Sequence, residues 1–562
     1  MGSNEFLFFA VKLLLMKKTS LLLSLLFVFG AITISSDVLG QRKTGRSKNV
    51  DMYFGTAIKK TLGKSMGQFL VSNKNGYVTH SFFNQQEIYT VYDTTLQPIA
   101  NEKFDRLQSD DAFVRKGFIR LKDKAVLLTG QTLHYDKANV VYLSAFDAEN
   151  LQTEKPEEVS RVVGNGYHPN FNNSHLNYAV SEDQSKFVVY FIKARRADKK
   201  DDATPHFQFL VFDADLKMLW KQDIAFESDE TYLLGGSDWQ EEAAENAIGI
   251  DNSGAVYCWG RTDKGEGFDF NSRYNVKISK ITAEAMEMIP LAGDQDKFVR
   301  NWTLQGIDAG MLMAANYMDW ENTTKSWVEK ADGLAFVNWS GAIKQRPIFK
   351  YIEFSDEHMA MNQSKSIVKK VGKMSKEPAG AFEENFAING FQKLDNENFL
   401  VMAETHLDST RYNAHLDVNI TTYTRNDAQF FSVNTKTGKL NWSLRIPKFQ
   451  ENKTEEGLGY VCKVSGDKMY VIFNDHFDNV EKEWKPENGV SKFSKMDNPV
   501  VMLAIDLNNP NQPVKREKIW KSEKVKTYFE PANFYSAADS NEGLLYLDDK
   551  AGKDIFVKMV FK

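Results

Sequence analysis

The sequence predicts an all-β protein folded as a single β-propeller, and three observations support this. A unit of two strands around a tight polar turn, a variable loop, and two more strands around an Asp/Asn turn recurs about eight times between Asp51 and Lys562. Long segments with helical periodicity are scarce, and the 40 Phe and 21 Tyr suit strands, which aromatic residues favour. Repeated units of this kind are typical of propellers. We therefore expect eight four-stranded blades, with seven blades and an extra hairpin as the alternative.

The turn between the first and second strands of each unit is short and polar. It is built from Asn, Asp, Ser and Gly, the residues that tight hairpin turns require. An apolar strand follows each turn, as at Phe187–Ile192 and Met469–Phe473. In the fourth unit the third strand, 274–281, is assigned by its position. The turns are Asn73–Gly76, Ser181–Gln184, Asp251–Gly254, Asp395–Asn398, Ser465–Asp467 and Asp539–Gly543.

The turn between the third and fourth strands is marked by an apolar strand that ends in Asp or Asn. Such a side chain can accept a hydrogen bond from its own backbone two residues on, and a nearby Gly or Asn tolerates positive φ. We therefore expect these residues to close turns rather than to bind ligands. They are Asp93, Asp147, Asp213, Asn338, Asn434 and Asp506.

The last unit ends at Lys562 after only three strands, the third being Asp554–Phe561. A spare strand, Met52–Ile58, lies near the other end of the chain. We predict that this N-terminal strand supplies the missing outer strand of the final blade. Closure of this kind leaves no large unpaired sheet edge.

The N-terminal segment has the pattern of a secretory signal peptide. Two lysines follow Met16, which is the expected start, and an apolar run then leads to small residues and Gly40. The alternative is a retained membrane anchor at Phe6–Ile34, which lysines interrupt. We expect a signal peptide at 1–40 and one propeller domain at 41–562, because no Pro-rich or Ser/Gly-rich linker divides the rest. The pattern resembles exported proteins of Gram-negative bacteria, whether periplasmic, outer-membrane associated or extracellular.

Composition and charge exclude several classes of partner. The chain is 42% hydrophobic and 26% charged, as ordinary globular proteins are. Removal of Met1–Gly40 would change the net charge from −5 to −6. A mildly acidic protein without a basic run is not expected to bind nucleic acid or anionic membrane surfaces. No segment after the signal peptide is long and apolar enough to span a bilayer.

The two cysteines, Cys258 and Cys462, fall in the fourth and seventh units. Blades that far apart would hold the two sulfurs beyond bonding distance. We expect two buried free thiols rather than a disulfide, a metal site or a redox motif.

One turn carries a family resemblance. The segment Asn434-Thr-Lys-Thr-Gly-Lys-Leu-Asn-Trp442 resembles the repeat of quinoprotein-like (PQQ-type) propellers, and Val211–Trp220 is a looser copy. The resemblance implies that Trp220 and Trp442 pack between blades. That family contains quinone-dependent dehydrogenases and non-catalytic periplasmic scaffolds. The dehydrogenases carry a vicinal Cys-Cys pair, which this chain lacks, so the resemblance favours the scaffold branch.

Sequence motifs for catalysis are absent. The chain has no Gly-rich phosphate loop, His-Glu-x-x-His or Gly-x-Ser-x-Gly. We therefore predict no cofactor and name no catalytic residue. A loop-bound metal ion is an alternative, with His406 and His415 as candidate ligands, although zinc would need three or four converging ligands.

Loop lengths predict which face binds a partner. Long second–third loops, among them Glu404–Asn426, and long connections between blades emerge on the same face of a propeller, and insertions on one face commonly mark the binding face. Aromatic and Arg side chains there are suited to interfaces. The candidates are Trp239, Trp320, Trp327, Trp484, Tyr412, Arg195 and Arg196.

These observations favour a secreted or periplasmic binding module or envelope scaffold for a protein or a glycan. The alternative is a propeller enzyme, such as a polysaccharide lyase, a hydrolase or a quinone-dependent dehydrogenase. Such an enzyme would need acids, His or a metal converging at the mouth of the central channel.

Overall fold

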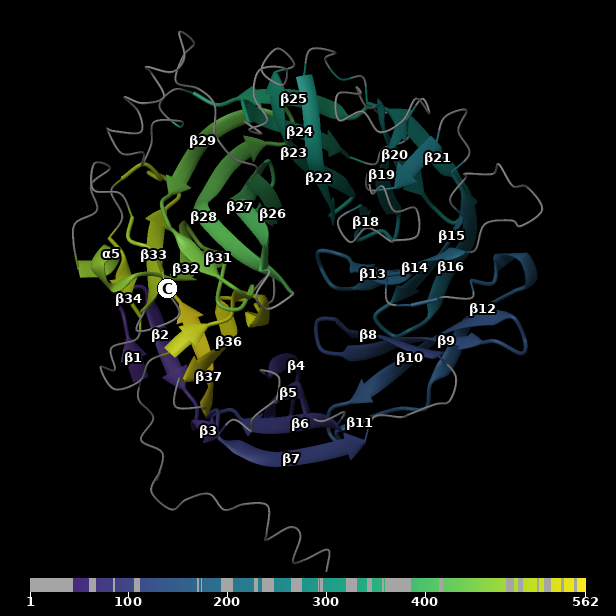
Figure 1. Cartoon of the computed structure of the whole chain (residues 1–562), viewed down its shortest axis with the longest axis horizontal. Helices are drawn as coiled ribbons and strands as arrows, with labels where there is room; N and C mark the ends of the chain where they lie inside the picture. Colours follow the sequence, from purple (N-terminus) through teal and green to yellow (C-terminus); the bar gives the residue numbers. More distant parts are fainter. Residues whose placement is uncertain are drawn as a thin grey trace, which may run out of the picture. The chain divides into compact units, whose positions relative to one another are not determined.

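Strands dominate the computed structural model, which describes residues 44–59, 67–83, 86–105, 112–168, 171–172, 174–193, 206–226, 231–234, 247–263, 275–291, 293, 297–319, 331–340, 346–355, 358, 386–413, 418–481, 490–493, 499–512, 515–519, 527–536, 540–549 and 553–562. In these residues the strands form eight antiparallel sheets. Within Thr44–Lys562 the sheets follow one another around a central axis (Figure 1). The fold is an all-β propeller, as the sequence predicted.

The first four sheets follow the chain order of the predicted units. The first contains β4 (Gln68–Asn73), β5 (Gly76–Phe83), β6 (Gln86–Asp93) and β7 (Pro98–Asp105). The second contains β8 (Ala112–Arg120), β9 (Ala125–Leu133) and β10 (Ala138–Asp147), with β11 (Gln152–Thr153) and β12 (Glu157–Val163) on β10. The third contains β13 (Leu176–Val180), β14 (Lys186–Lys193), β15 (His206–Asp213) and β16 (Met218–Ala225). The fourth contains β17 (Thr231–Leu234) and β18 (Ile248–Ile250), both on β19 (Val256–Asp263), then β20 (Asn275–Ile281) and β21 (Met286–Pro290).

The other four sheets complete the ring. The fifth contains β22 (Lys297–Ile307), β23 (Gly310–Asp319), β24 (Gly333–Trp339) and β25 (Ile348–Glu353). The sixth contains β26 (Phe386–Lys393), β27 (Asn398–Asn413), β28 (Val418–Asn434) and β29 (Lys439–Ile446), with β30 (Gln450–Asn452) on β28. The seventh contains β31 (Tyr460–Ser465), β32 (Lys468–Asn474), β33 (Val500–Asp506) and β34 (Glu517–Lys518). The eighth contains β35 (Thr527–Phe529), β36 (Glu542–Asp549), β37 (Lys553–Phe561), β2 (Val50–Phe54) and β1 (Thr44–Arg46), with β3 (Ile58–Lys59) on β37.

Helical structure in the described residues is brief. One α-helix, α5 (Phe477–Glu481), and the short 3-10 helices η1 (Gly164–Gly166) and η3 (Pro531–Asn533) lie between strands. None of the helices that the structure describes has the length and apolar character needed to cross a membrane.

The two ends of the ring close on each other as predicted. Strand β2 pairs antiparallel with β37, with Val50 opposite Phe561 and Met52 opposite Met559. The buried side chains of β2 join those of the seventh and eighth sheets in one hydrophobic cluster. The N-terminal strand therefore supplies an outer strand of the last sheet, so β37 has a neighbour on each side.

The hydrophobic core is divided into layers between neighbouring sheets. One cluster joins the second and third sheets through Leu128 and Phe187, and another joins the fifth and sixth sheets through Phe336 and Phe431. Full burial of a side chain of this size stabilises a fold by about 1.5–3 kcal/mol. Each added sheet thus adds its own layer of core, which explains how Thr44–Lys562 forms one compact unit.

Most of the polar turns have the chemistry predicted from the sequence. Asn338 is the exception, because its Nδ2 donates to the Thr435 carbonyl of the next sheet at 2.9 Å instead of closing its own turn. Asp93 Oδ1 accepts hydrogen bonds from the backbone N–H groups of Thr95 and Gln97, at 2.7 and 2.9 Å. Asp147, Asp213, Asn434 and Asp506 close their turns in the same way. In three of these turns the residue with positive φ is a leucine rather than Gly or Asn. The φ angles of Leu96, Leu151 and Leu216 are 64°, 54° and 63°. Leu96 and Leu151 are buried, and this burial offsets the strain of the left-handed conformation.

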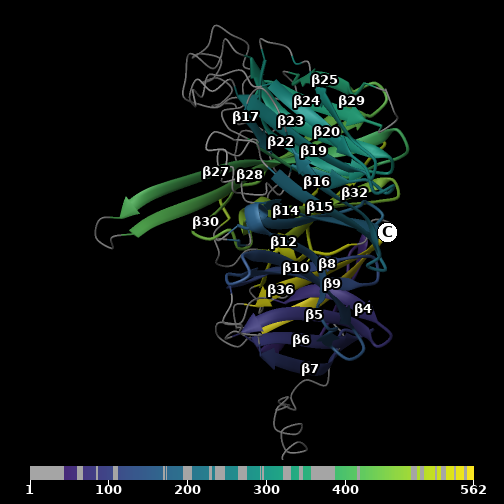
Figure 2. The same cartoon turned by 90° about the vertical axis from the view of Figure 1, so that its right-hand side faces the viewer.

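One predicted loop was wrong. The segment Glu404–Asn426 was expected to be a long loop, but most of it continues β27 and β28 as a paired two-stranded ribbon. Figure 2 shows this ribbon projecting beyond the sheets on one side of the ring. The sequence Ile420-Thr-Thr-Tyr-Thr424 explains the difference, because β-branched and aromatic residues favour strands.

Both cysteines are free thiols, as predicted, but only one of the two is fully buried. Cys258 lies on β19 and is buried, and Cys462 lies on β31 and is partly buried. The two thiols do not form a disulfide with each other, as expected for cysteines in the fourth and seventh sheets. Burial raises the pKa of the Cys258 thiol to about 12, so this group stays protonated at neutral pH.

Candidate functional site

The ribbon of β27 and β28 is the most prominent feature of the face that carries the second–third loops. We define the ribbon as His406–Asn413 of β27 and Val418–Arg425 of β28, which pair from His406 opposite Arg425 to Asn413 opposite Val418. Ser409, Thr410 and Arg411 are exposed, and the Tyr412 side chain is 63% exposed near the end. The Thr410 and Thr421 hydroxyl oxygens are 3.0 Å apart across the two strands.

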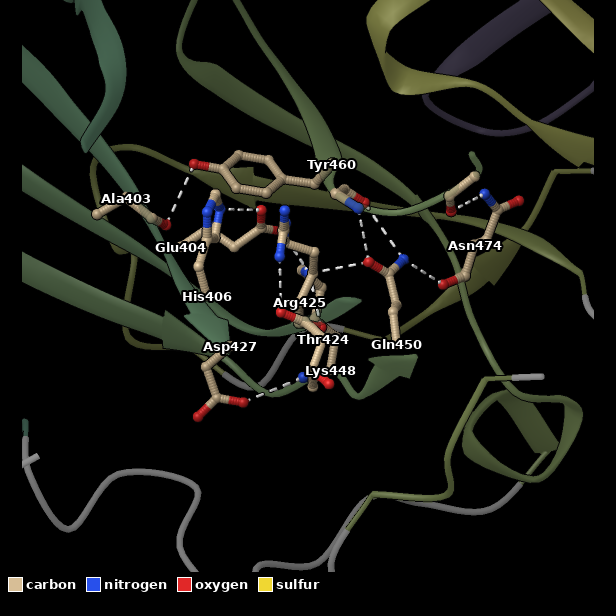
Figure 3. Close-up of polar contacts among 12 residues, drawn as sticks. Ala403, Glu404, His406, Thr424, Arg425, Asp427, Lys448, Gln450, Tyr460 and Asn474 are labelled. Carbon is tan, nitrogen blue, oxygen red and sulfur yellow. Dashed lines mark hydrogen bonds and ion pairs between the residues drawn. The ribbon is translucent and has the colours of Figure 1, made fainter. Parts of the chain in front are cut away.

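A buried ion pair lies at the root of the ribbon. Glu404, the last regular residue of β27 before a β-bulge, places Oε1 2.5 Å from Lys448 Nζ. Its other oxygen, Oε2, is 2.9 Å from Nε2 of His406 (Figure 3). The side chains of Glu404 and Lys448 are 3% and 0% exposed, so each charge is compensated inside the protein. A buried carboxylate or ammonium without such a partner would be strongly destabilising.

Further contacts of Lys448 tie both strands of the ribbon to the segment after β29. Lys448 Nζ donates to Gln450 Oε1 at 3.0 Å and to the Arg425 carbonyl at 3.3 Å. The Lys448 backbone N–H donates to Asp427 at 3.2 Å, and Asp427 pairs with Arg445. The ammonium therefore contacts β27 through Glu404 and β28 through Arg425.

The network continues into the seventh sheet. Gln450 accepts from the Gly459 N–H at 2.8 Å and donates to the Asn474 carbonyl at 2.8 Å. The Tyr460 hydroxyl donates to the Ala403 carbonyl at 3.3 Å. Figure 3 shows Gln450 between Lys448 and Asn474, with dashed lines that mark these contacts. The ribbon thus extends from a cross-linked base in two sheets.

Burial and the neighbouring charges shift the pKa values of Glu404, Lys448 and Tyr460. Burial alone would raise the pKa of Glu404, but the Lys448 charge and the His406 hydrogen bond lower it below its usual value. Burial lowers the pKa of Lys448 and raises that of Tyr460 well above its usual range. Glu404 is therefore ionised and Tyr460 neutral at neutral pH. The paired charges suit a structural anchor better than a proton-transfer site.

The predicted binding residues fall mostly outside the described part of the chain. Tyr412 is described and lies near the exposed end of the ribbon. The other candidates, Trp239, Trp320, Trp327, Trp484, Arg195 and Arg196, lie outside the described residues and remain predictions.

The described residues do not complete a set of metal ligands around His406. His406 is bound to Glu404, and His415 lies outside the described residues. In the part of the chain that the structure describes, no three His, Cys, Asp or Glu side chains gather in a way that could hold a metal ion. His406 was singled out by its sequence context, and in the structure it contacts Glu404 at the root of the ribbon. A metal ion held by His406 and His415 stays a prediction.

Glu404 and Lys448 were missed in the sequence. Glu404 follows the apolar strand residues Phe399–Ala403 and reads as the start of a polar loop, and Lys448 follows Pro447 after the end of a strand. Neither residue belongs to a motif, and 44 positions separate them. The signal available in the sequence was that Glu404, a charged residue, directly continues an apolar strand.

The resemblance of two turns to the quinoprotein-like repeat is matched by the packing of their tryptophans. The Trp220 indole N–H donates to the Gly254 carbonyl, in a turn of the next sheet, at 3.1 Å. Trp442 packs on the cluster between the sixth and seventh sheets. Both bridge neighbouring sheets, but each is only partly buried.

Comparisons with known proteins find solved structures that are similar in fold, but they do not identify a protein family. No protein-family model matches the chain, and no curated protein matches it. Among solved structures, prolyl oligopeptidase B from Galerina marginata is similar over 87% of this chain and 56% of its own, with 8% identity and a TM-score of 0.36. The Nup133 β-propeller domain of Vanderwaltozyma polyspora is similar over 79% of this chain and 99% of its own, with 11% identity and a TM-score of 0.30. The dihydro-heme d1 dehydrogenase NirN is similar over 88% and 73%, with 10% identity and a TM-score of 0.32. At these scores the fold assignment rests on the sheet topology itself.

Proposed function

We propose that this chain is an exported binding module that engages a protein partner through the β27–β28 ribbon. The observation that carries the proposal is a long exposed ribbon built on a buried ion-paired base. Strand β30 covers the edge of β28 at Tyr423–Arg425, and no other strand of the described residues pairs with the rest of the ribbon. Backbone groups along such an edge can hydrogen-bond to an added strand of another protein. The rigid base supports this role because a contact element that is already ordered loses less entropy on binding.

The surface chemistry of the ribbon also suits a protein partner. Its exposed residues combine an aromatic ring, Tyr412, with Arg411 and small hydroxyl side chains such as Thr410. Tyr and Arg are the residues that most often provide binding energy in protein interfaces. The acid and base groups at the root are paired with each other, which favours binding over catalysis. Export is part of the proposal and rests on the sequence pattern of 16–40.

The test is co-purification from the native cell envelope with a ribbon-shortened variant. Replacing 409–422 with Asn-Gly would join Asp408 and Tyr423, which pair with each other, and would keep Glu404 and Arg425 in place. Tyr135→Ala is the matched control, because Tyr135 is fully exposed at the β9–β10 turn of another sheet.

We expect one partner in stoichiometric amount with the wild type and with Tyr135→Ala, and its loss with the shortened ribbon. Retention of the same partner by a folded shortened variant would contradict the proposal. So would recovery of a glycan rather than a protein.

A further inference from the structure

A polar cavity lies at the end of the central channel opposite the ribbon. Its volume is about 430 Å³, within the ~300–1,000 Å³ of small-molecule sites. Arg120, Val180 and Gln392 lie at or next to the last residues of β8, β13 and β26, which places the cavity where the first strands turn into the second ones. The ribbon leaves the ring where the second strands turn into the third ones. The lining is Arg120, Tyr178, Val180, Gln184, Gln392, Cys462, Lys463, Phe534, Tyr535 and Ser536.

The lining is cationic and rich in hydrogen-bonding groups. Arg120 and Lys463 supply positive charge, and the described residues that line the cavity include no Asp or Glu. Lys463 is 3% exposed, so this residue belongs to the wall of the cavity rather than to the outer surface. A positive site of low dielectric attracts an anion more strongly than an exposed lysine does.

Arg120 is held in place by a backbone carbonyl and an aromatic ring. Its Nη1 donates to the Phe69 carbonyl at 3.2 Å, and its guanidinium lies 5.7 Å from the centre of the Tyr535 ring. Tyr535 in turn stacks on Phe69, with ring centres 4.4 Å apart. In the described part of the chain no carboxylate forms an ion pair with Arg120. The remaining N–H groups of a fixed guanidinium match the planar geometry of a carboxylate.

The wall also carries amide and hydroxyl groups. Gln184 adopts a positive φ of 57°, and strained residues are common where a ligand binds. Gln392 Oε1 accepts from Cys462, and the Ser536 hydroxyl donates to the Glu542 carbonyl. Arg120 is therefore the group of the wall that best explains which ligand the cavity would take.

The cysteine in the wall supports binding rather than covalent chemistry. Cys462 Sγ donates to Gln392 Oε1 at 3.8 Å, and burial raises the pKa of this thiol well above its usual range. The thiolate is the nucleophilic form of cysteine, and here it would be rare at neutral pH.

We propose that this cavity binds a small carboxylate, with Arg120 holding the carboxylate group. This inference is independent of the ribbon, because it concerns the opposite end of the channel. The charge and the planar fork of Arg120 select a carboxylate over a neutral ligand of the same size.

The test is calorimetric titration of the full chain with D-glucuronate, D-gluconate and L-tartrate, with D-glucose as the neutral match and inorganic phosphate as the competing anion. We expect at least one of the three hydroxy acids to bind saturably, at least tenfold more tightly than glucose or phosphate. Arg120→Gln should weaken that binding at least tenfold. Arg161→Gln, at an exposed arginine that pairs with Glu158 on the surface of β12, should leave it unchanged.

Three outcomes would overturn the proposal: no hydroxy acid binds the wild type, glucose or phosphate binds equally well, or Arg120→Gln has no effect. If Arg120→Gln does not fold, Gln184→Gly serves instead, because it removes the amide and relieves the positive φ. In that case unchanged affinity for the bound hydroxy acid would overturn the role of the cavity.

Discussion

Glu404 and Lys448 form an ion pair between β27 and the segment after β29, with Oε1 and Nζ 2.5 Å apart and both side chains almost completely buried. The pair stands where the ribbon leaves the sixth sheet, and its neighbours reach into the seventh. A buried pair of this kind adds little net stability compared with an apolar pair, but it is costly to break. Its position therefore links the geometry of the ribbon to the stability of two sheets.

Lys448→Met should lower the free energy of unfolding by about 3–5 kcal/mol, because it leaves Glu404 buried without its partner. Lys436→Met, at an exposed pair with Glu397, should change it by less than ~1 kcal/mol. Chemical denaturation of the two variants checks the difference. The double change Glu404→Leu with Lys448→Met should recover much of the loss, and equal losses for the single and double variants would contradict the assignment.

Met52→Ala should destabilise the protein by about 2–5 kcal/mol, because Met52 is a buried residue of the closing strand β2. Tyr53→Ala, one residue later on the opposite and more exposed face, is the control and should cost much less. Thermal unfolding of the two variants checks this prediction. Similar losses at both positions would mean that the closing strand does not pack as described.

The pH dependence of stability should contain a contribution from His80. Burial, with a smaller effect of the Arg115 charge, lowers the pKa of His80 from 6.5 to about 3. In the unfolded chain His80 therefore binds a proton below about pH 6.5, whereas in the folded protein it binds one only below about pH 3. The free energy of unfolding consequently falls as pH falls through this window.

His80→Asn should make the fall in melting temperature between pH 7 and pH 4 shallower. His134→Asn, at an exposed histidine, should leave the slope as it is in the wild type. Melting temperatures measured across this pH range check the difference, and identical slopes for all three proteins would refute the role of His80.

Asp251→Ala should cost about 1–3 kcal/mol, because it leaves buried donors without an acceptor. Asp251 accepts from the N–H groups of Ser253 and Ala255 and from the Tyr257 hydroxyl, at 2.9, 3.0 and 3.0 Å. Asp395→Ala removes the matching residue from an exposed turn, where water can replace it. Denaturation should show the larger loss for Asp251→Ala, and the reverse order would contradict this account of the turns.

The fold was largely predictable because its determinants are local. Five of the six closing turn residues act on their own backbone, Asn338 being the exception, and the alternation of polar turns and apolar strands repeats in each sheet. The ribbon was missed because the Thr and Tyr residues between Glu404 and Asn426 were interpreted as part of a polar loop rather than as strand formers. The pair of Glu404 with Lys448 and the cavity around Arg120 depend on the arrangement of distant sheets. No local pattern in one sequence reports such an arrangement.

The most direct test of the central claim is photo-crosslinking in the native envelope from a light-activated residue placed at Tyr412. The same residue at Tyr135, exposed at the same end of the ring on another sheet, is the control. If the ribbon contacts the partner, one discrete protein adduct is expected from position 412, and position 135 should not give it. No adduct from position 412, or the same adducts from both positions, would contradict the proposal that the ribbon contacts the partner.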